Sequence, residues 1–168
     1  MKKGLVVVGI LRFLLAGCST TGSSAKETDP EVQEISVSLP AELTTLDTTQ
    51  TTDKVTFTVI QHLFEGLYRF DEKSQPVPGL AEEAVISEDG KTYTFKLKEE
   101  AKWSDGQQVQ AADFAYAWKK LVDPKTMGPN AYLLDNVVNS QDIREGKADI
   151  ATIGLETPDE KTFVVHLE

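Results

Sequence analysis

Three stretches of the chain alternate apolar and polar residues, with the period of a strand that buries one face. The first covers residues 34–39, and Pro40 ends it. The second covers residues 92–98 and the third residues 162–167, and an acidic, turn-forming segment precedes each of these two. The pattern therefore predicts three strands. Their expected inward-facing residues are Ile35, Val37, Leu39, Tyr93, Phe95, Leu97, Phe163, Val165 and Leu167.

Two other stretches have apolar residues at helical spacing. Between Asp53 and Leu67, Asp53 is a plausible N-cap and Gly66 lies near the expected end of the helix. The second helix is predicted over residues 111–122, and Asp123-Pro124 ends it. The apolar faces of the two helices are Val59, Ile60, Leu63, Phe64 and Leu67, and Phe114, Trp118, Leu121 and Val122.

The first residues have the layout of a secretory signal. Lys2 and Lys3 precede an apolar run over residues 5–15, which Arg12 interrupts, and small residues precede Cys18. Residues 15–18, Leu-Ala-Gly-Cys, resemble the lipobox of bacterial lipoproteins, in which the cysteine sulfur receives a diacylglycerol, the leader is cut before the cysteine, and the new terminus is acylated. We therefore expect a lipoprotein signal peptide over residues 1–17 with lipidation at Cys18. The alternative is a buried structural thiol.

Polar residues follow this cysteine, and no side chain among residues 19–30 is large and apolar enough to anchor a core. We interpret residues 18–32 as a flexible tether and residues 33–168 as the folded domain. The chain has 40% hydrophobic and 26% charged residues, which is typical of a soluble domain with a core. Because Cys18 is the single cysteine, the chain cannot form an internal disulfide.

The charge argues against a nucleic-acid partner. The formal net charge is −10, and it becomes −13 without the three basic residues of the leader. A surface of that sign repels a phosphate backbone, although it also serves solubility alone.

The residues offer little for catalysis or metal binding. His62 and His166 lie far apart, and neither has a partner at metal-ligand spacing, so structural roles are favoured for both. Phosphate-binding loops and nucleophile elbows are also missing from the sequence. The carboxylates that could imitate a glycosidase pair are better explained as solvated surface groups. They are Glu82, Glu83, Glu99, Glu100 and Asp105. We expect no enzyme activity, no cofactor and no metal.

The two tryptophans allow two interpretations. Trp103 and Trp118 could stack on a ligand or pack in a core, and core packing is the favoured interpretation.

An ordered series of short motifs carries a family resemblance. It consists of Leu46-Asp47, Leu63-Phe64-Glu65-Gly66-Leu67, Pro78-Gly79-Leu80-Ala81-Glu82, residues 89–98, Ala101-Lys102-Trp103-Ser104-Asp105-Gly106, Ala112-Asp113-Phe114 and Asp123-Pro124-Lys125-Thr126. In order and spacing the series resembles the bacterial extracellular solute-binding proteins of family 5, the oligopeptide-binding subunits of ABC importers. The likeness spans nearly everything after the tether.

The resemblance implies an α/β fold, in part that of a type II periplasmic binding protein. Residues 35–47 would supply an early strand of the first large lobe, and the rest would form most of the small extra domain of family 5. The second large lobe would lie beyond Glu168. Since the chain also stops on a strand residue, we expect an amino-terminal, truncated part of a longer protein.

The resemblance also implies a function. The protein would capture oligopeptides for the permease subunits of an ABC transporter, and its lipid would hold it on the extracytoplasmic face of a Gram-positive-like cell membrane. An extended peptide would pair with protein backbone. The alternative is a truncated, non-transporting surface lipoprotein or an inert remnant.

Four residues would contact the ligand by the same resemblance: Thr52, Asp53, Lys54 and Asn130. Near Asn130, peptide-binding relatives often have a tyrosine that faces the ligand, whereas this chain has Tyr132 two residues later, which leaves the ligand's identity open. Asp53 has the alternative role of helix cap. Gln110 replaces the threonine usual before the second helix and so removes a good N-cap side chain.

Overall fold

The computed structural model describes residues 34–168, and contacts divide the chain into the units Met1–Ser38 and Leu39–Glu168. Of the first unit, only residues 34–38 are described, and they form no strand. The strand predicted over residues 34–39 is therefore wrong: Ile35 is 88% exposed and Val37 is 74% exposed. Alternation alone does not form a strand, because its backbone groups need a neighbouring strand, and none pairs with them among the described residues.

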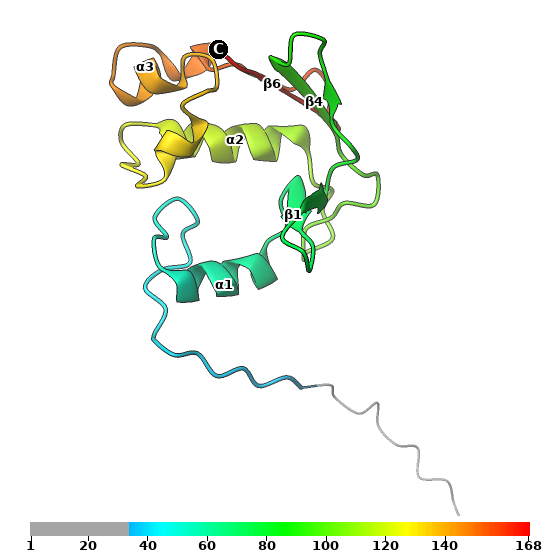
Figure 1. Cartoon of the computed structure of the whole chain (residues 1–168), viewed down its shortest axis with the longest axis vertical. Coiled ribbons are helices and arrows are strands. Elements are labelled where there is room, and N and C mark those ends of the chain that lie inside the picture. Colours follow the sequence, from blue (N-terminus) through cyan, green and yellow to red (C-terminus); the bar gives the residue numbers. More distant parts are fainter. Residues whose placement is uncertain (1–33) are drawn as a thin grey trace, which may run out of the picture. The chain divides into compact units, whose positions relative to one another are not determined.

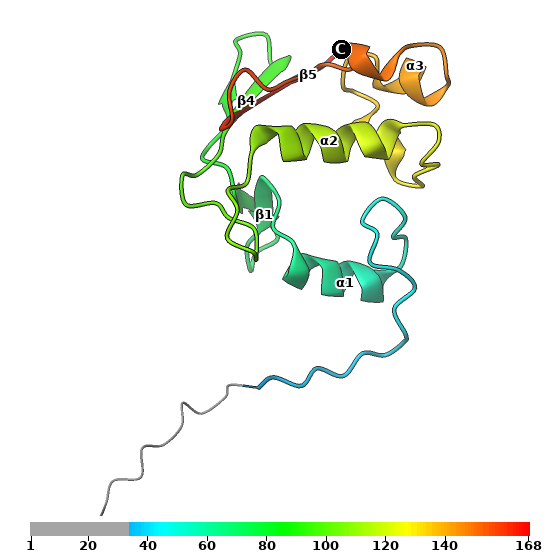
Figure 2. The ribbon, with the colours of Figure 1, turned by 180° about the vertical axis from the view of Figure 1, so that it is seen from behind.

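The second unit is built on a four-stranded antiparallel sheet with the order β3-β4-β6-β5 (Figures 1 and 2). The strands are β3 (Val85–Ile86), β4 (Thr92–Lys96), β5 (Leu155–Glu156) and β6 (Thr162–His166). The two predicted strands β4 and β6 are confirmed, and they pair along their whole length with Phe95 opposite Phe163. Side chains on one face of a sheet point the same way at alternate positions. This face carries Leu97, Phe163 and Val165, which are buried.

Helix α2 (Ala111–Val122) packs against β6 and has the predicted bounds. The Trp118 ring meets the Phe163 ring edge-on, with centroids 5.4 Å apart, and the Phe114 ring lies 6.1 Å from Phe163. Aromatic pairs favour such tilted and edge-on geometries. Phe163 is fully buried and lies at the centre of the core. The core also includes Leu67, Ala81, Leu97, Ala101, Val109, Ala111, Ala115, Val122, Val137, Ile143, Ile153, Leu155 and Val165.

The start of α2 shows how the chain manages without a short cap residue. The Gln110 side chain makes no capping hydrogen bond, as its type predicted. Instead the Asp113 carboxylate accepts a hydrogen bond from the Gln110 backbone N–H at 2.9 Å, and the Trp103 indole N–H donates to the same oxygen at 3.2 Å. An acidic residue in the first turn also interacts favourably with the helix dipole.

Between α2 and β5 lie three short helical segments for which the sequence offered no clear period: η1 (Ala131–Leu134), α3 (Ser140–Arg144) and η2 (Ile150–Thr152). Both η1 and α3 pack against α2. The buried Ile143 fixes α3 to the core, and the Val138 N–H donates to the His166 carbonyl at 2.9 Å. These contacts close the segment over one end of the sheet (Figure 1).

Helix α1 (Lys54–Leu63) is shorter than the predicted range, because the backbone is already extended at Phe64. The chain then enters the hairpin of β1 (Tyr68–Phe70) and β2 (Pro76–Pro78). Gly79 is required here, since a Cβ atom at this position would lie 2.6 Å from the Gly66 carbonyl oxygen. None of the helices in residues 34–168 has the length and apolar character needed to cross a membrane.

Candidate functional site

The loop before α1, residues 47–53, begins in a tight turn made by Asp47. Its Oδ1 atom accepts hydrogen bonds from the Thr49 backbone N–H at 2.9 Å and from the Thr49 hydroxyl at 2.7 Å. Its Oδ2 atom accepts one from the Lys120 ammonium on α2 at 3.3 Å. The Thr49 hydroxyl, the Thr49 amide and then Lys120 lower the pKa of Asp47, because each favours the charged carboxylate. The Leu-Asp motif is therefore a turn that contacts α2.

Asp53 ends the loop as the N-cap of α1, which confirms that prediction. Its Oδ1 atom accepts from the Thr56 backbone N–H at 2.8 Å, and its Oδ2 atom accepts from the Thr44 hydroxyl at 2.8 Å. These bonds, with the Thr56 amide as the largest cause, lower the pKa of Asp53. Both carboxylate oxygens thus have a partner inside the protein.

The centre of the loop is fixed by the segment that follows α2. The Asn130 side-chain amide donates to the Thr51 carbonyl at 2.7 Å, and the Gln50 side-chain amide donates to the Thr126 carbonyl at 2.7 Å. Thr49 and Thr51 are buried, whereas Thr52 is exposed. The backbone is therefore fixed at Thr51, directly before the exposed residue Thr52.

The structure brings the four predicted ligand-contacting residues into one neighbourhood. Thr52, Asp53 and Lys54 follow Thr51 directly, and Asn130 is bonded to Thr51. The side chains of Thr52 and Lys54 are exposed. Sequence reasoning missed Gln50, Lys120 and Thr126, which hold this loop, since each contact joins residues more than 70 positions apart. The fifth predicted site residue, Cys18, lies outside the described residues.

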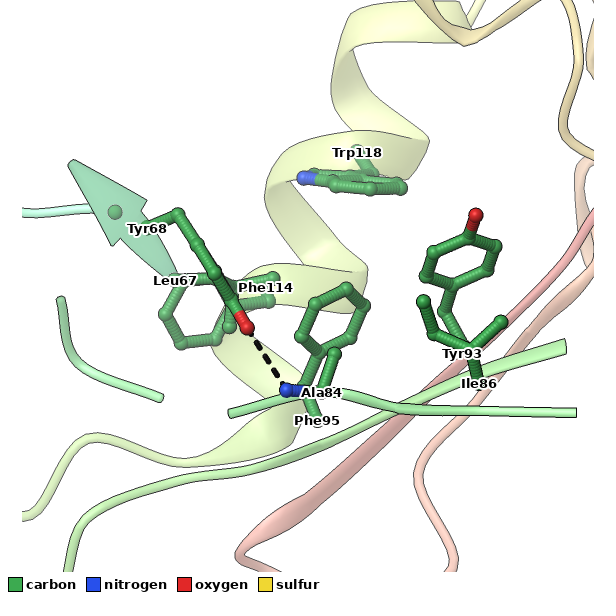
Figure 3. A pocket seen from close by; sticks show the side chains of 9 residues that line it. Leu67, Tyr68, Ala84, Ile86, Tyr93, Phe95, Phe114 and Trp118 are labelled. Atoms are coloured by element: carbon green, nitrogen blue, oxygen red, sulfur yellow. Dashed lines mark hydrogen bonds between the residues drawn. The ribbon is translucent and has the colours of Figure 1, made fainter. Parts of the chain in front are cut away.

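Two apolar cavities lie elsewhere in the unit Leu39–Glu168. The first has a volume of about 560 Å³ and lies between α2, the start of β1 and the four-stranded sheet. Tyr68, Phe95 and Trp118 are among the residues that line it (Figure 3). The Tyr68 hydroxyl accepts a hydrogen bond from the Ala84 backbone N–H at 2.8 Å (Figure 3). None of the four predicted contact residues lines this cavity.

The second cavity, of about 580 Å³, has walls from the end of α1 and from α2. Trp103 lines it and is 45% exposed, so the expectation that both tryptophans pack in the core holds for Trp118 and is wrong for Trp103. The indole of Trp103 bonds to Asp113 at the helix start instead of entering the core.

The histidines have local partners. The His166 ring lies 3.0 Å from a Glu156 carboxylate oxygen, and the His62 ring lies 2.6 Å from the Thr58 carbonyl oxygen one turn earlier in α1. Within residues 34–168, no three histidine, cysteine or acidic side chains come together as a metal site would require.

A substitution at Asp53 tests the cap through its pH dependence. Because the folded pKa lies below the ordinary value, about 3.9 for an aspartate, the cap stabilises above that pH and the stabilisation is lost as pH falls through the folded pKa. We expect Asp53→Ala to lower the melting temperature at pH 7 and the difference from wild type to shrink by pH 3. Thermal melts at both pH values measure this. A difference that is equal at both would contradict a carboxylate cap.

Comparison with protein-family models gives one match. Residues 75–168 match the model of the bacterial extracellular solute-binding proteins, family 5 Middle, which is more than half of the chain. The chain belongs to this family. The motif resemblance is thereby confirmed, and the family is one of proteins that bind solutes.

Individual family 5 proteins agree with this result. A dipeptide-binding protein of Lactococcus lactis is 37% identical over 161 residues, which is 96% of this chain and 28% of the relative. The substrate-binding domain of an oligopeptide ABC transporter from Bacillus anthracis superposes with a TM-score of 0.71 at 40% identity, over 73% of this chain and 24% of its own. Haemophilus influenzae OppA, in complex with the peptide RPPGFSPFR, has a TM-score of 0.72 at 41% identity, over 76% and 25%. The chain thus spans about a quarter of the length of these relatives.

Proposed function

We propose that this chain forms part of a receptor that captures oligopeptides outside the cytoplasmic membrane and delivers them to the permease of an ABC importer. The observation that carries the proposal is the anchored loop of residues 47–53, whose backbone is held by Asp47 at Thr49 and by Asn130 at Thr51, directly before the exposed Thr52. The similarity to peptide-binding family members supports it. No catalytic step belongs to this function.

The mode of binding follows from backbone chemistry. An extended peptide gains affinity by pairing its main chain with protein backbone, which is independent of the peptide's sequence. We assign the ligand-facing wall to Thr52, Asp53, Lys54 and Asn130. A rigid wall lowers the ordering cost of binding, because a loop that is already fixed loses little conformational freedom when a peptide arrives.

The location outside the membrane is part of the proposal. Residues 1–17 would direct export, the thiol of Cys18 would carry lipid, and residues 18–32 would connect the lipid to the domain of residues 33–168. The resemblance of residues 15–18 to a lipobox supports this assignment. The extracellular character of the family agrees with it.

A chimera tests the peptide-binding function. Residues 39–168 would replace the matched quarter of Haemophilus influenzae OppA, and isothermal titration calorimetry with RPPGFSPFR would measure affinity. We expect a dissociation constant within about tenfold of the parent, equivalent to about 1.4 kcal/mol. The 168-residue chain alone is expected to give no binding heat, since it spans a quarter of the relatives. The unaltered parent is the positive control.

Two results would oppose the proposal. A chimera that melts cooperatively and binds no RPPGFSPFR would show that this loop does not form a peptide-binding wall. Tight binding by the 168-residue chain alone would show that the site lies within it and needs no second lobe.

A further inference from the structure

The side chain of Asn130, in the candidate site, makes a hydrogen bond within the protein. The Asn130 amide group donates to the Thr51 carbonyl at 2.7 Å, a contact between residues 79 positions apart. Thr51 is fully buried and is the last buried residue before Thr52 and Lys54, which are exposed. An amide can satisfy a buried carbonyl, whereas a carboxylate has no proton to donate to it.

The other side-chain contacts of the loop hold the backbone of residues other than Thr51. Asp47 fixes the beginning of the loop through Thr49, and Asp53 fixes its end through Thr56. The Gln50 amide reaches the Thr126 carbonyl from the exposed side of the loop. Among the described residues, Asn130 supplies the one side-chain bond to the backbone of residues 51–54 from outside the loop and α1.

We propose that Asn130 is a positioning residue for peptide binding: its amide holds the Thr51 carbonyl and thereby orients the backbone of residues 52–54 toward the ligand. The proposal rests on the proposed function and gives Asn130 a positioning role in addition to its place in the ligand-facing wall. A donor is essential at this position, because an unsatisfied buried carbonyl favours conformations in which it reaches water. Loss of the donor therefore loosens the loop without disturbing the sheet.

The variant Asn130→Asp tests the donor with almost no change of shape. At pH 7 its carboxylate opposes the Thr51 carbonyl, and near pH 4 a protonated carboxyl group can donate again, since an aspartate titrates at about 3.9. Asn130→Ala removes the donor at every pH. Asn136→Asp is the matched control, because Asn136 is exposed and lies close in sequence to Asn130.

The first measurement uses the 168-residue chain and needs no ligand. NMR order parameters of the backbone amides at residues 51–54 are expected to fall from about 0.85 toward 0.6 in Asn130→Asp and Asn130→Ala at pH 7. Amides of β4 and β6 and the Asn136→Asp control should match wild type. Unchanged order parameters at residues 51–54 in both Asn130 variants would overturn the proposal.

The second measurement uses the chimera with Haemophilus influenzae OppA and the peptide RPPGFSPFR. Asn130→Asp is expected to raise the dissociation constant of the peptide about tenfold at pH 7. The ratio of the variant's dissociation constant to that of wild type should move toward one by pH 4. The ratio for Asn130→Ala should stay constant with pH. If the ratio of dissociation constants for Asn130→Asp also stayed the same between pH 7 and pH 4, the donor role of Asn130 would be overturned. A wild-type chimera without peptide binding would defeat the proposed function instead, and the order parameters would still decide whether Asn130 positions the loop.

Discussion

Replacing Phe163 by alanine is expected to lower the free energy of unfolding by about 3–5 kcal/mol. Phe163 is fully buried, and three aromatic rings surround it: Phe95 at 6.3 Å, Phe114 at 6.1 Å and Trp118 at 5.4 Å between centroids. The loss combines the transfer of a large apolar side chain to water with a cavity between β4, β6 and α2, which cannot collapse because the backbone of the sheet holds its walls apart.

Urea unfolding of the 168-residue chain, followed by circular dichroism, measures this effect. Tyr116→Ala is the matched control, since Tyr116 lies on the same helix as Trp118 but is 69% exposed. We expect it to change the free energy by no more than about 0.5 kcal/mol. Equal effects of the two substitutions would mean that Phe163 is not the centre of the core.

Replacing Cys18 by alanine is expected to abolish fatty-acid attachment and to release the protein from the membrane. The prediction rests on the sequence Leu-Ala-Gly-Cys at residues 15–18 and on the basic and apolar residues before it. A buried methylene contributes about 0.8 kcal/mol to membrane binding, and stable anchoring needs more than one acyl chain. Without the sulfur no chain can be attached, so the loss should be complete.

Labelling of expressing cells with a clickable fatty acid, followed by separation of membrane and soluble fractions, measures both effects. Ser19→Ala is the control, because it changes the neighbouring residue and leaves the thiol in place. Label that persists in Cys18→Ala would disprove this attachment site. A wild-type protein without label would favour the alternative of an unmodified thiol, and Arg12 in the apolar run would be the first residue to replace.

Local sequence patterns correctly predicted those helices and strands that find a packing partner within the described residues. Residues 92–98 and 162–167 form β4 and β6, because each provides the partner strand that the other needs. Residues 111–122 form α2 because one apolar stripe meets that sheet. Residues 34–39 alternate equally well but form no strand, since no partner lies among the described residues. The same local signal therefore gave different outcomes according to tertiary pairing.

In the candidate site, too, contacts between residues close in sequence were predictable and contacts between distant residues were not. The capping role of Asp53 was predictable, because its partner Thr56 lies three residues away in the same helix. The bond from Asn130 to Thr51 was not, because it spans 79 residues and depends on the path of the chain around the end of α2. The position of Trp103 was also missed, since a hydrogen bond to Asp113 keeps it half exposed.

By itself the sequence determined the family, the turns, the two long strands, the second helix and the cap of α1, because each depends on residues that are close along the chain. The tertiary structure alone decided which strands pair, that Phe163 is central, and that Asn130 holds the loop before Thr52. Those features join distant residues, and only the packing of the sheet, α2 and the loop brings their atoms within hydrogen-bonding or van der Waals distance.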